Sequence, residues 1–133
     1  AKYKKKLDAE IRGPLEYGLT IFGGKSGEYP QKLYKALMNS QTVLTVWDDA
    51  RLVGLIRVLD DSEMLAQIHY VLVHPEYQGQ GIAGRMVEYI KEKYKNFMYL
   101  ELMPEDKNNV PFYEKHGFHV MENGAAMQIC NIN

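Results

Sequence analysis

The chain has 133 residues, 46% of them hydrophobic, and a formal net charge of −1. This length suits one core, so we expect a single domain over residues 1–133. The near-zero charge gives no field that recruits nucleic acid or acidic membranes, and the basic run Lys2 and Lys4–Lys6 is interpreted as a solvated strand end. The single cysteine, Cys130, excludes an internal disulfide and suits a reducing, cytoplasmic compartment; its apolar surroundings indicate a buried side chain.

Hydrophobic periodicity and turn residues predict the elements in chain order. We expect a strand over 3–8, turns with one short helix over 10–27, and a helix over 30–39. Strands over 43–47 and 52–59 form a hairpin, and a third strand covers 65–73. A helix over 80–95, a strand over 97–102 and a short helix over 109–116 that ends at Gly117 follow. The last hairpin pairs 118–121 with 126–130 around Asn123 and Gly124.

This order predicts an α/β (α+β) fold with a mixed, mostly antiparallel sheet and helices on both faces. Within it, residues 71–84 form a strand, a tight glycine turn and a helix start. Backbone N–H groups and the helix dipole make such a turn a site for a phosphate or pyrophosphate.

Three phosphate-binding patterns compete for this turn. The P-loop fails, because Arg85 and Met86 stand where Lys and Ser/Thr belong. The dinucleotide fingerprint G-x-G-x-x-G fits residues 79–84, but it lies late in a short chain in which one strand–helix–strand unit follows. The third pattern, Q/R-x-x-G-x-G/A after V-x-P, fits Gln78, Gly81 and Ala83 at every position.

With this third pattern the chain resembles the GNAT superfamily of acyl-CoA-dependent N-acyltransferases. A second block, Pro111–Phe118, looks like the family's F-Y-x-K-x-G-F segment, so that the resemblance anchors roughly residues 64–120. His69, Val73-His74, Glu105-Asp106 and Val110–Tyr113 look most like the arylalkylamine-acetyltransferase branch.

The resemblance implies that the strands at 64–73 and 97–102 splay apart and hold acetyl-CoA between them. The backbone of Val71, Leu72 and Val73 then pairs with the pantetheine amides, and Gln78 braces the turn or reaches a phosphate oxygen. The pyrophosphate is held by the backbone N–H groups of Gly79, Gln80, Gly81, Ile82, Ala83 and Gly84.

Acyl transfer needs a neutral amine, donors for the tetrahedral oxyanion, and a proton for the leaving thiolate. The motif position makes Tyr113 the candidate acid, against the alternative that it merely packs. His69 is the candidate base; strand alternation places it with Gln67, Val71 and Val73 on one face. Gln67 stands where the arylalkylamine branch has a second histidine, so a relay of two histidines is in doubt. A structural role for His69 and a water-mediated role for Glu101 as the base therefore both stay open.

The remaining residues favour a small amine acceptor and give no pattern of metal ligands. His116 and His119 form no ligand cluster with an acid or cysteine, and His74 is interpreted as a turn residue. A small amine acceptor is favoured by aromatic and acidic residues near the expected pocket: Tyr17, Phe22, Tyr29, Trp47, Asp60, Asp61 and Glu63. The expected function is N-acetyl transfer from acetyl-CoA to a small primary amine, without nucleic acid or membrane partners. Transfer to a protein lysine or N-terminus and a non-catalytic acyl-CoA sensor remain alternatives, and the resemblance implies a homodimer through the C-terminal strands.

Overall fold

The structure, a computed structural model, describes residues 2–4 and 28–132. The chain divides into two compact units, the first ending at Leu102 and the second beginning at Met103, and each is described by itself. The turns and short helix predicted over 10–27, and the part of the first predicted strand beyond Lys4, lie outside the described residues.

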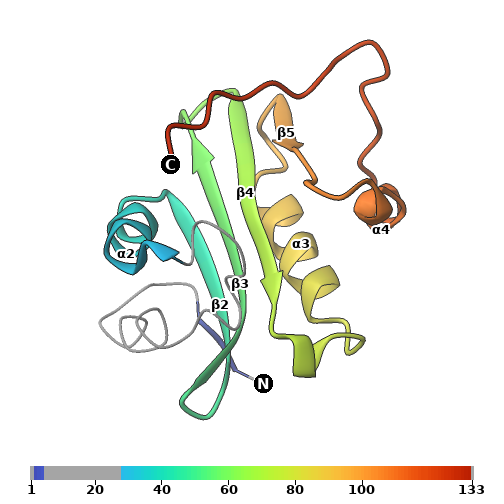
Figure 1. The fold of residues 1–133 in the computed structure, drawn as a ribbon. Coiled ribbons are helices and arrows are strands. Elements are labelled where there is room, and N and C mark those ends of the chain that lie inside the picture. Colours follow the sequence, from blue (N-terminus) through green and yellow to red (C-terminus); the bar gives the residue numbers. More distant parts are fainter. Residues whose placement is uncertain (1, 5–27, 133) are drawn as a thin grey trace. The chain divides into compact units, whose positions relative to one another are not determined.

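The first unit is built on a five-stranded sheet with the order β1-β2-β3-β4-β5. All neighbouring strands are antiparallel except β4 and β5, which are parallel. This confirms the predicted mixed, mostly antiparallel sheet (Figure 1). The strands are β1 (Lys2–Lys4), β2 (Thr42–Asp48), β3 (Arg51–Asp60), β4 (Leu65–Val73) and β5 (Tyr99–Leu102).

Helix α2 (Pro30–Met38) covers one face of the sheet, here called the α2 face. Pro30 begins the helix, where its missing N–H removes no intrahelical hydrogen bond. Leu33 and Leu37 lie one turn apart and are both buried. They pack in one core cluster with side chains of β2 and β3: Val43, Trp47, Leu52 and Leu55.

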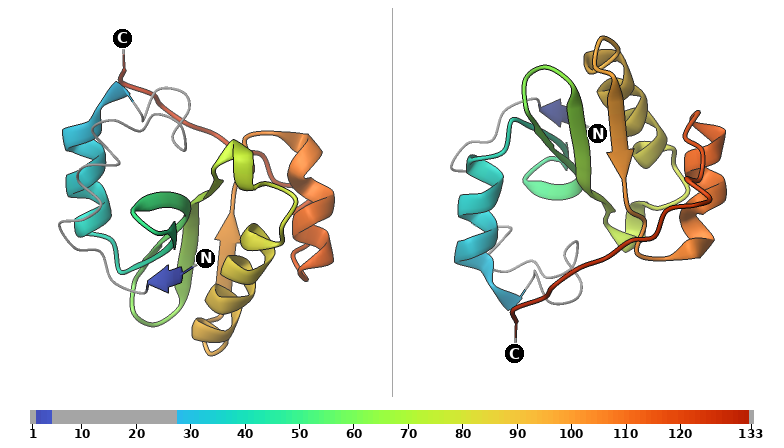
Figure 2. Two further views of the ribbon diagram at one scale, coloured as in Figure 1. Left: turned by 90° about the horizontal axis from the view of Figure 1, so that it is seen from below. Right: turned by 90° about the horizontal axis from the view of Figure 1, so that it is seen from above.

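Helix α3 (Ile82–Lys93) covers the opposite face, here called the α3 face, as Figure 2 shows. Its buried side chains Ile82, Met86, Val87 and Ile90 recur at helical spacing. The helix approaches the sheet closely at Gly54 of β3, because a Cβ there would lie 3.0 Å from Ile82 Cγ2. The predicted helices on both faces are therefore confirmed.

A buried polar network holds the C-terminal end of α3 against the sheet. The Tyr94 side chain is 4% exposed, and its hydroxyl donates to Asp60 Oδ2 across 2.6 Å. Thr42 Oγ1 lies 2.6 Å from the same hydroxyl. Burial, and then the hydrogen bond to Asp60, raise the pKa of Tyr94 to about 12.

Strand β4 carries a β-bulge at His69. In the ladder with β3, Val58 pairs with Ile68 and Arg57 pairs with Tyr70, so His69 is the extra residue. A bulge of this kind interrupts the alternation of side chains between the two faces of a sheet.

The bulge overturns the predicted grouping of β4 side chains. We expected His69 to share a face with Val71 and Val73, and this is wrong. Val73 pairs with Gly54 and so lies on the α3 face, as does Val71 two residues earlier. His69 instead bonds to Arg57 on the α2 face, where two further β4 side chains pack against the core cluster: Tyr70 and Leu72.

The second unit contains the 3₁₀ turn η4 (Lys107–Asn109) and the short helix α4 (Val110–Lys115). The Asp106 carboxylate caps η4 by accepting from the Asn108 N–H across 2.9 Å. Gly117 follows α4 with φ of +93°, which confirms its predicted place at the helix end.

The hairpin predicted over 118–121 and 126–130 is wrong. A turn forms, with the Gly124 N–H donating to the Met121 carbonyl across 3.0 Å, but residues 118–132 contain no strand. The side chains of residues 119–132 are exposed, Met127 by 90% and Ile129 by 88%, so no buried face supports an otherwise marginal two-stranded hairpin. For the same reason Cys130 is exposed and not buried as predicted.

Candidate active site

The turn between β4 and α3 begins at a buried histidine. His74 is 5% exposed, and its backbone N–H donates to the Val53 carbonyl of β3 across 2.8 Å. Its Nδ1 accepts from the Glu76 N–H across 3.1 Å and so caps the 3₁₀ turn η3 (Pro75–Tyr77). The interpretation of His74 as a turn residue is confirmed.

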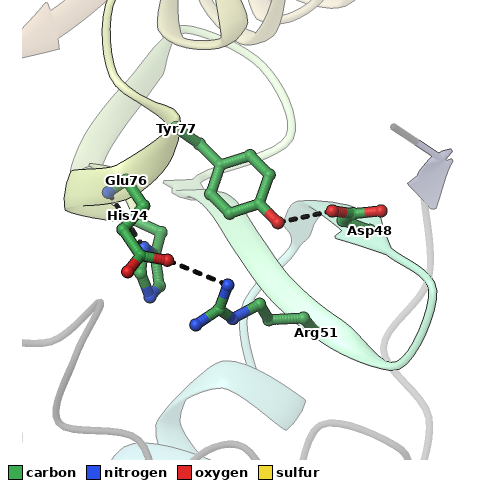
Figure 3. A network of polar contacts seen from close by, with 5 residues as sticks. All are labelled: Asp48, Arg51, His74, Glu76 and Tyr77. Carbon is green, nitrogen blue, oxygen red and sulfur yellow. Dashed lines mark hydrogen bonds and ion pairs between the residues drawn. The ribbon is translucent and has the colours of Figure 1, made fainter.

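A polar latch ties η3 to the β2–β3 hairpin, as Figure 3 shows. The Tyr77 hydroxyl donates to Asp48 Oδ2. Arg51 Nη1 donates to Glu76 Oε2 across 3.0 Å, and the guanidinium lies 5.8 Å from the centre of the Tyr77 ring. These contacts fix the segment directly before the glycine turn, although each is exposed and individually weak.

The glycine turn has the backbone that a pyrophosphate site needs. Gly79 and Gly81 have φ of +82° and +81°, a conformation that other residues adopt at a cost. A Cβ at either position would meet no described atom within 4 Å, so the protein leaves the space beside the turn open. Gly81 is the N-cap of α3 and no side chain caps this end, so its first N–H groups are available to an anion.

The end of β4 presents a backbone edge next to this turn. β5 pairs with β4 from Leu65 to Ile68 and ends at Leu102. Within the described residues no strand pairs with Val71–Val73 on the β5 side. The edge therefore offers N–H and C=O groups of the kind that hold an amide-containing chain.

Polar side chains gather on the α2 face around the bulge. Arg57 Nη1 lies 2.6 Å from His69 Nδ1. A guanidinium only donates, so Nδ1 accepts and the ring proton of a neutral His69 is on Nε2. Gln67 and Glu101 are register partners across β4 and β5, and Gln67 also pairs with Leu59, two residues from Arg57, which places both on this face.

The structure thus brings His69 and Glu101 to one face and separates both from the side chains of Val71 and Val73. Tyr113 belongs to the second unit. The Tyr113 carbonyl accepts from the Phe118 N–H across 3.1 Å. The Glu114 carbonyl accepts from the Gly117 N–H across 3.0 Å. These two hydrogen bonds form a Schellman motif at the end of α4. The Tyr113 side chain is half-buried, and burial raises its pKa above the usual value.

Two of the acidic residues expected to attract an amine, Asp60 and Asp61, have local roles. The Asp61 carboxylate accepts from three backbone N–H groups at 2.7 to 3.1 Å, and these hydrogen bonds hold its pKa below the usual range. Asp60 bonds to Tyr94, and Trp47 is buried in the core cluster. Tyr17 and Phe22 lie outside the described residues.

Neither a metal centre nor a membrane segment is found in the part of the chain that the structure describes. Over residues 28–132 no three side chains of His, Cys, Asp or Glu gather as a metal site would require. No helix in the same range combines the length and apolar character needed to cross a bilayer.

The comparisons with known proteins agree with the fold. The family model described as the acetyltransferase (GNAT) family matches residues 16–118, and the chain belongs to this family. The chain is 30% identical over 115 residues to the uncharacterized N-acetyltransferase in the lysA 3′ region of Bacillus methanolicus, covering 86% of this chain and 91% of that protein.

Two solved structures extend this likeness. A probable acetyltransferase from meticillin-resistant Staphylococcus aureus has a TM-score of 0.82 and 25% identity, with coverage of 97% of this chain and 98% of that one. A GNAT family acetyltransferase from Elizabethkingia anophelis, described with acetyl-CoA bound, has a TM-score of 0.66 and 18% identity, covering 90% and 76% of the two chains. At this identity the second likeness concerns the fold.

Sequence reasoning missed three features. The latch between η3 and the β2–β3 hairpin leaves no periodic signal, because it depends on side chains far apart in the chain. The Tyr94 network was missed for the same reason. Arg57 does leave a signal, since it is a lone cation between the apolar residues Ile56 and Val58 of β3.

Proposed function

We propose that this acetyltransferase moves an acetyl group from acetyl-CoA to a primary amine on a small molecule. The observation that carries the proposal is the turn at Gly79 and Gly81, with positive φ and open space beside it, at the uncapped start of α3. A phosphate can approach such a backbone closely. The adjoining edge of Val71–Val73 suits the pantetheine amides.

The roles of the turn residues follow from these contacts. The backbone N–H groups of Gly79, Gln80, Gly81, Ile82, Ala83 and Gly84 bind the pyrophosphate. Gln78 holds the turn against the end of β4, because its side-chain amide donates to the Val73 carbonyl across 3.2 Å. A backbone N–H at Val71 or Leu72 stabilises the oxyanion.

In the chemical step the amine nitrogen bonds to the acetyl carbon and the carbon–sulfur bond breaks. One proton must leave the nitrogen, and the thiolate gains one. Glu101, acting through water, and His69 are the two candidate bases. The bond from Arg57 occupies the Nδ1 lone pair of a neutral His69, and this favours Glu101 as the base.

Tyr113 is proposed as the acid that protonates the leaving thiolate. The described residues give its hydroxyl no hydrogen bond, and burial keeps the phenol protonated by raising its pKa. This role requires both units to act as one domain over 1–133, which is part of the proposal.

Three finer assignments belong to the same proposal. The arylalkylamine-acetyltransferase branch is supported by His69, Glu105-Asp106 and Val110–Tyr113. A cytoplasmic location is supported by the single cysteine, Cys130. A homodimer stays a prediction, which light scattering during size-exclusion chromatography checks.

The test is a thiol-release assay with acetyl-CoA and a panel of small amines, run beside lysine peptides and peptides with free N-termini. We expect release of CoA with small amines. Turnover of peptides alone favours a protein acetyltransferase, and acetyl-CoA binding without turnover indicates a sensor. The base is identified by pH–rate profiles of Glu101→Gln and His69→Gln; the profile that loses its acidic limb marks the base.

A further inference from the structure

Arg57 is a cation set into an apolar part of the sheet. Its neighbours in β3, Ile56 and Val58, are fully buried, and the Arg57 side chain is half-buried on the α2 face. Burial lowers the pKa of Arg57, because it disfavours the charged form. A guanidinium nevertheless stays charged near neutral pH, so a positive charge is held here at a cost in free energy.

The contacts of Arg57 are all with neutral groups. Nε donates to Ser40 Oγ across 2.8 Å, Nη1 lies 2.6 Å from His69 Nδ1, and the guanidinium carbon lies 5.8 Å from the centre of the Tyr70 ring. Over residues 28–132 no carboxylate lies within ion-pair distance of it. Arg51, in contrast, pairs with Glu76 at 3.0 Å.

This arrangement positions the guanidinium without neutralising it. A guanidinium has five N–H donors in a planar fork, and two are used here. The remaining donors match the geometry of a carboxylate or a phosphate, which accepts two parallel hydrogen bonds. Ser40 and His69 fix the fork from two sides, so an anion meets it already oriented.

The cation also lies on the same face as a proposed catalytic residue. Glu101 on β5 faces the α2 side with His69, and β3 and β5 are two strand spacings apart, roughly 10 Å. A negative group at Glu101 and a positive group at Arg57 are complementary to a molecule with an amine at one end and an anionic group at the other.

We propose that the acceptor is a primary amine that also carries a carboxylate or phosphate, and that Arg57 binds this anionic group. The inference rests on the proposed function and names the substrate class for the same site. It makes Arg57 a determinant of acceptor specificity, because a simple alkylamine leaves the half-buried cation without a counter-charge.

The experiment compares amines in matched pairs that differ in the anionic group. Hexylamine is set against ε-aminocaproate and propylamine against β-alanine for the carboxylate, and ethanolamine against phosphoethanolamine for the phosphate. For each amine, kcat/KM is measured with wild type, Arg57→Gln and Lys32→Gln, together with the KM for acetyl-CoA. Lys32 is exposed on α2 and is not among the contacts of Arg57, so its variant removes one positive charge and leaves those contacts in place.

We expect the wild type to favour the anionic member of at least one pair by roughly 10- to 100-fold in kcat/KM. In Arg57→Gln, the ratio of kcat/KM between the anionic and the neutral member of the pair should fall close to one, because the KM for the anionic amine rises. The KM for acetyl-CoA should change little. Lys32→Gln should keep the wild-type ratio. The pair that shows the preference distinguishes a carboxylate from a phosphate.

Equal turnover of both members of every pair by the wild type overturns the inference and leaves the proposed function standing. An equal loss for both members in Arg57→Gln also overturns it. If none of the tested amines leads to release of CoA, this result contradicts the proposed function itself. If Arg57→Gln does not fold, Arg57→Lys keeps the charge and removes the fork, and a weakened preference for the anionic amine is then expected.

Discussion

The side-chain amide of Gln78 donates to the carbonyl oxygen of Val73, five residues earlier, across 3.2 Å. This bond closes the segment that contains η3 and holds the start of the glycine turn against the end of β4. It couples the two parts of the proposed acetyl-CoA site, the strand edge and the phosphate turn.

Replacing Gln78 with Ala should weaken acetyl-CoA binding by about 2- to 10-fold, the range expected for one hydrogen bond that orders a binding loop. The affinity is measured by isothermal titration calorimetry. Gln31→Ala, which removes an exposed amide from α2, serves as the matched control and should bind normally. Equal affinity in Gln78→Ala and wild type contradicts the bracing role.

Substitutions at Gly81 separate the effect of a side chain on backbone strain from its effect on acetyl-CoA binding. Its φ of +81° costs Ala about 1–2 kcal/mol, whereas Asn adopts this conformation more readily. Gly81→Ala should therefore lower the melting temperature more than Gly81→Asn does. Both variants should lose acetyl-CoA affinity roughly tenfold or more, because either side chain enters the space beside the turn. Unchanged affinity in both variants argues against a phosphate site.

Tyr113→Phe should lower kcat by about 100-fold or more, since the variant removes the proton donor and keeps the ring. The KM for acetyl-CoA should change little. Because burial raises the pKa of Tyr113 above its usual value of 10.0, loss of wild-type activity through this phenol is expected above pH 10. Tyr99→Phe, at an exposed position of β5, is the matched control. A normal kcat for Tyr113→Phe refutes the acid role.

The free energy of unfolding should fall at alkaline pH, because the stabilisation that the protonated Tyr94 provides is lost there. Its folded pKa of about 12 exceeds the value of 10.0 expected when unfolded, so the folded state retains a proton that the unfolded state loses. The stabilisation is complete below pH 10 and declines between pH 10 and 12. Urea unfolding at several pH values measures this decline, and Tyr94→Phe should reduce it. The variant should also cost about 1–3 kcal/mol near neutral pH, because Thr42 and Asp60 lose a buried partner.

Features with a local signal were predicted from the sequence. The spacing of Ile82, Met86 and Ile90 predicts α3, and Pro30 marks the start of α2. The glycine turn was recognised because positive φ and close approach to a ligand both demand glycine at fixed positions. These signals depend on neighbours within a few residues.

Features that depend on tertiary pairing were not predicted. The bulge at His69 was invisible, since residues 65–73 read as an ordinary strand whichever residue is left unpaired. The C-terminal hairpin failed for a related reason. Asn123 and Gly124 lie in the turn region as expected, but strand formation needs a buried face that residues 118–132 lack.

The bulge at His69 determines which face each later side chain of β4 occupies. If His69 paired with Arg57 in a regular ladder, every later side chain of the strand would change face. Tyr70 and Leu72 would turn from the α2 core toward α3, and Val71 would turn the other way. We therefore infer that deleting residue 69 leaves the later side chains of β4 on their present faces, because Tyr70 already pairs with Arg57, whereas a shift of this pairing by one residue reverses them.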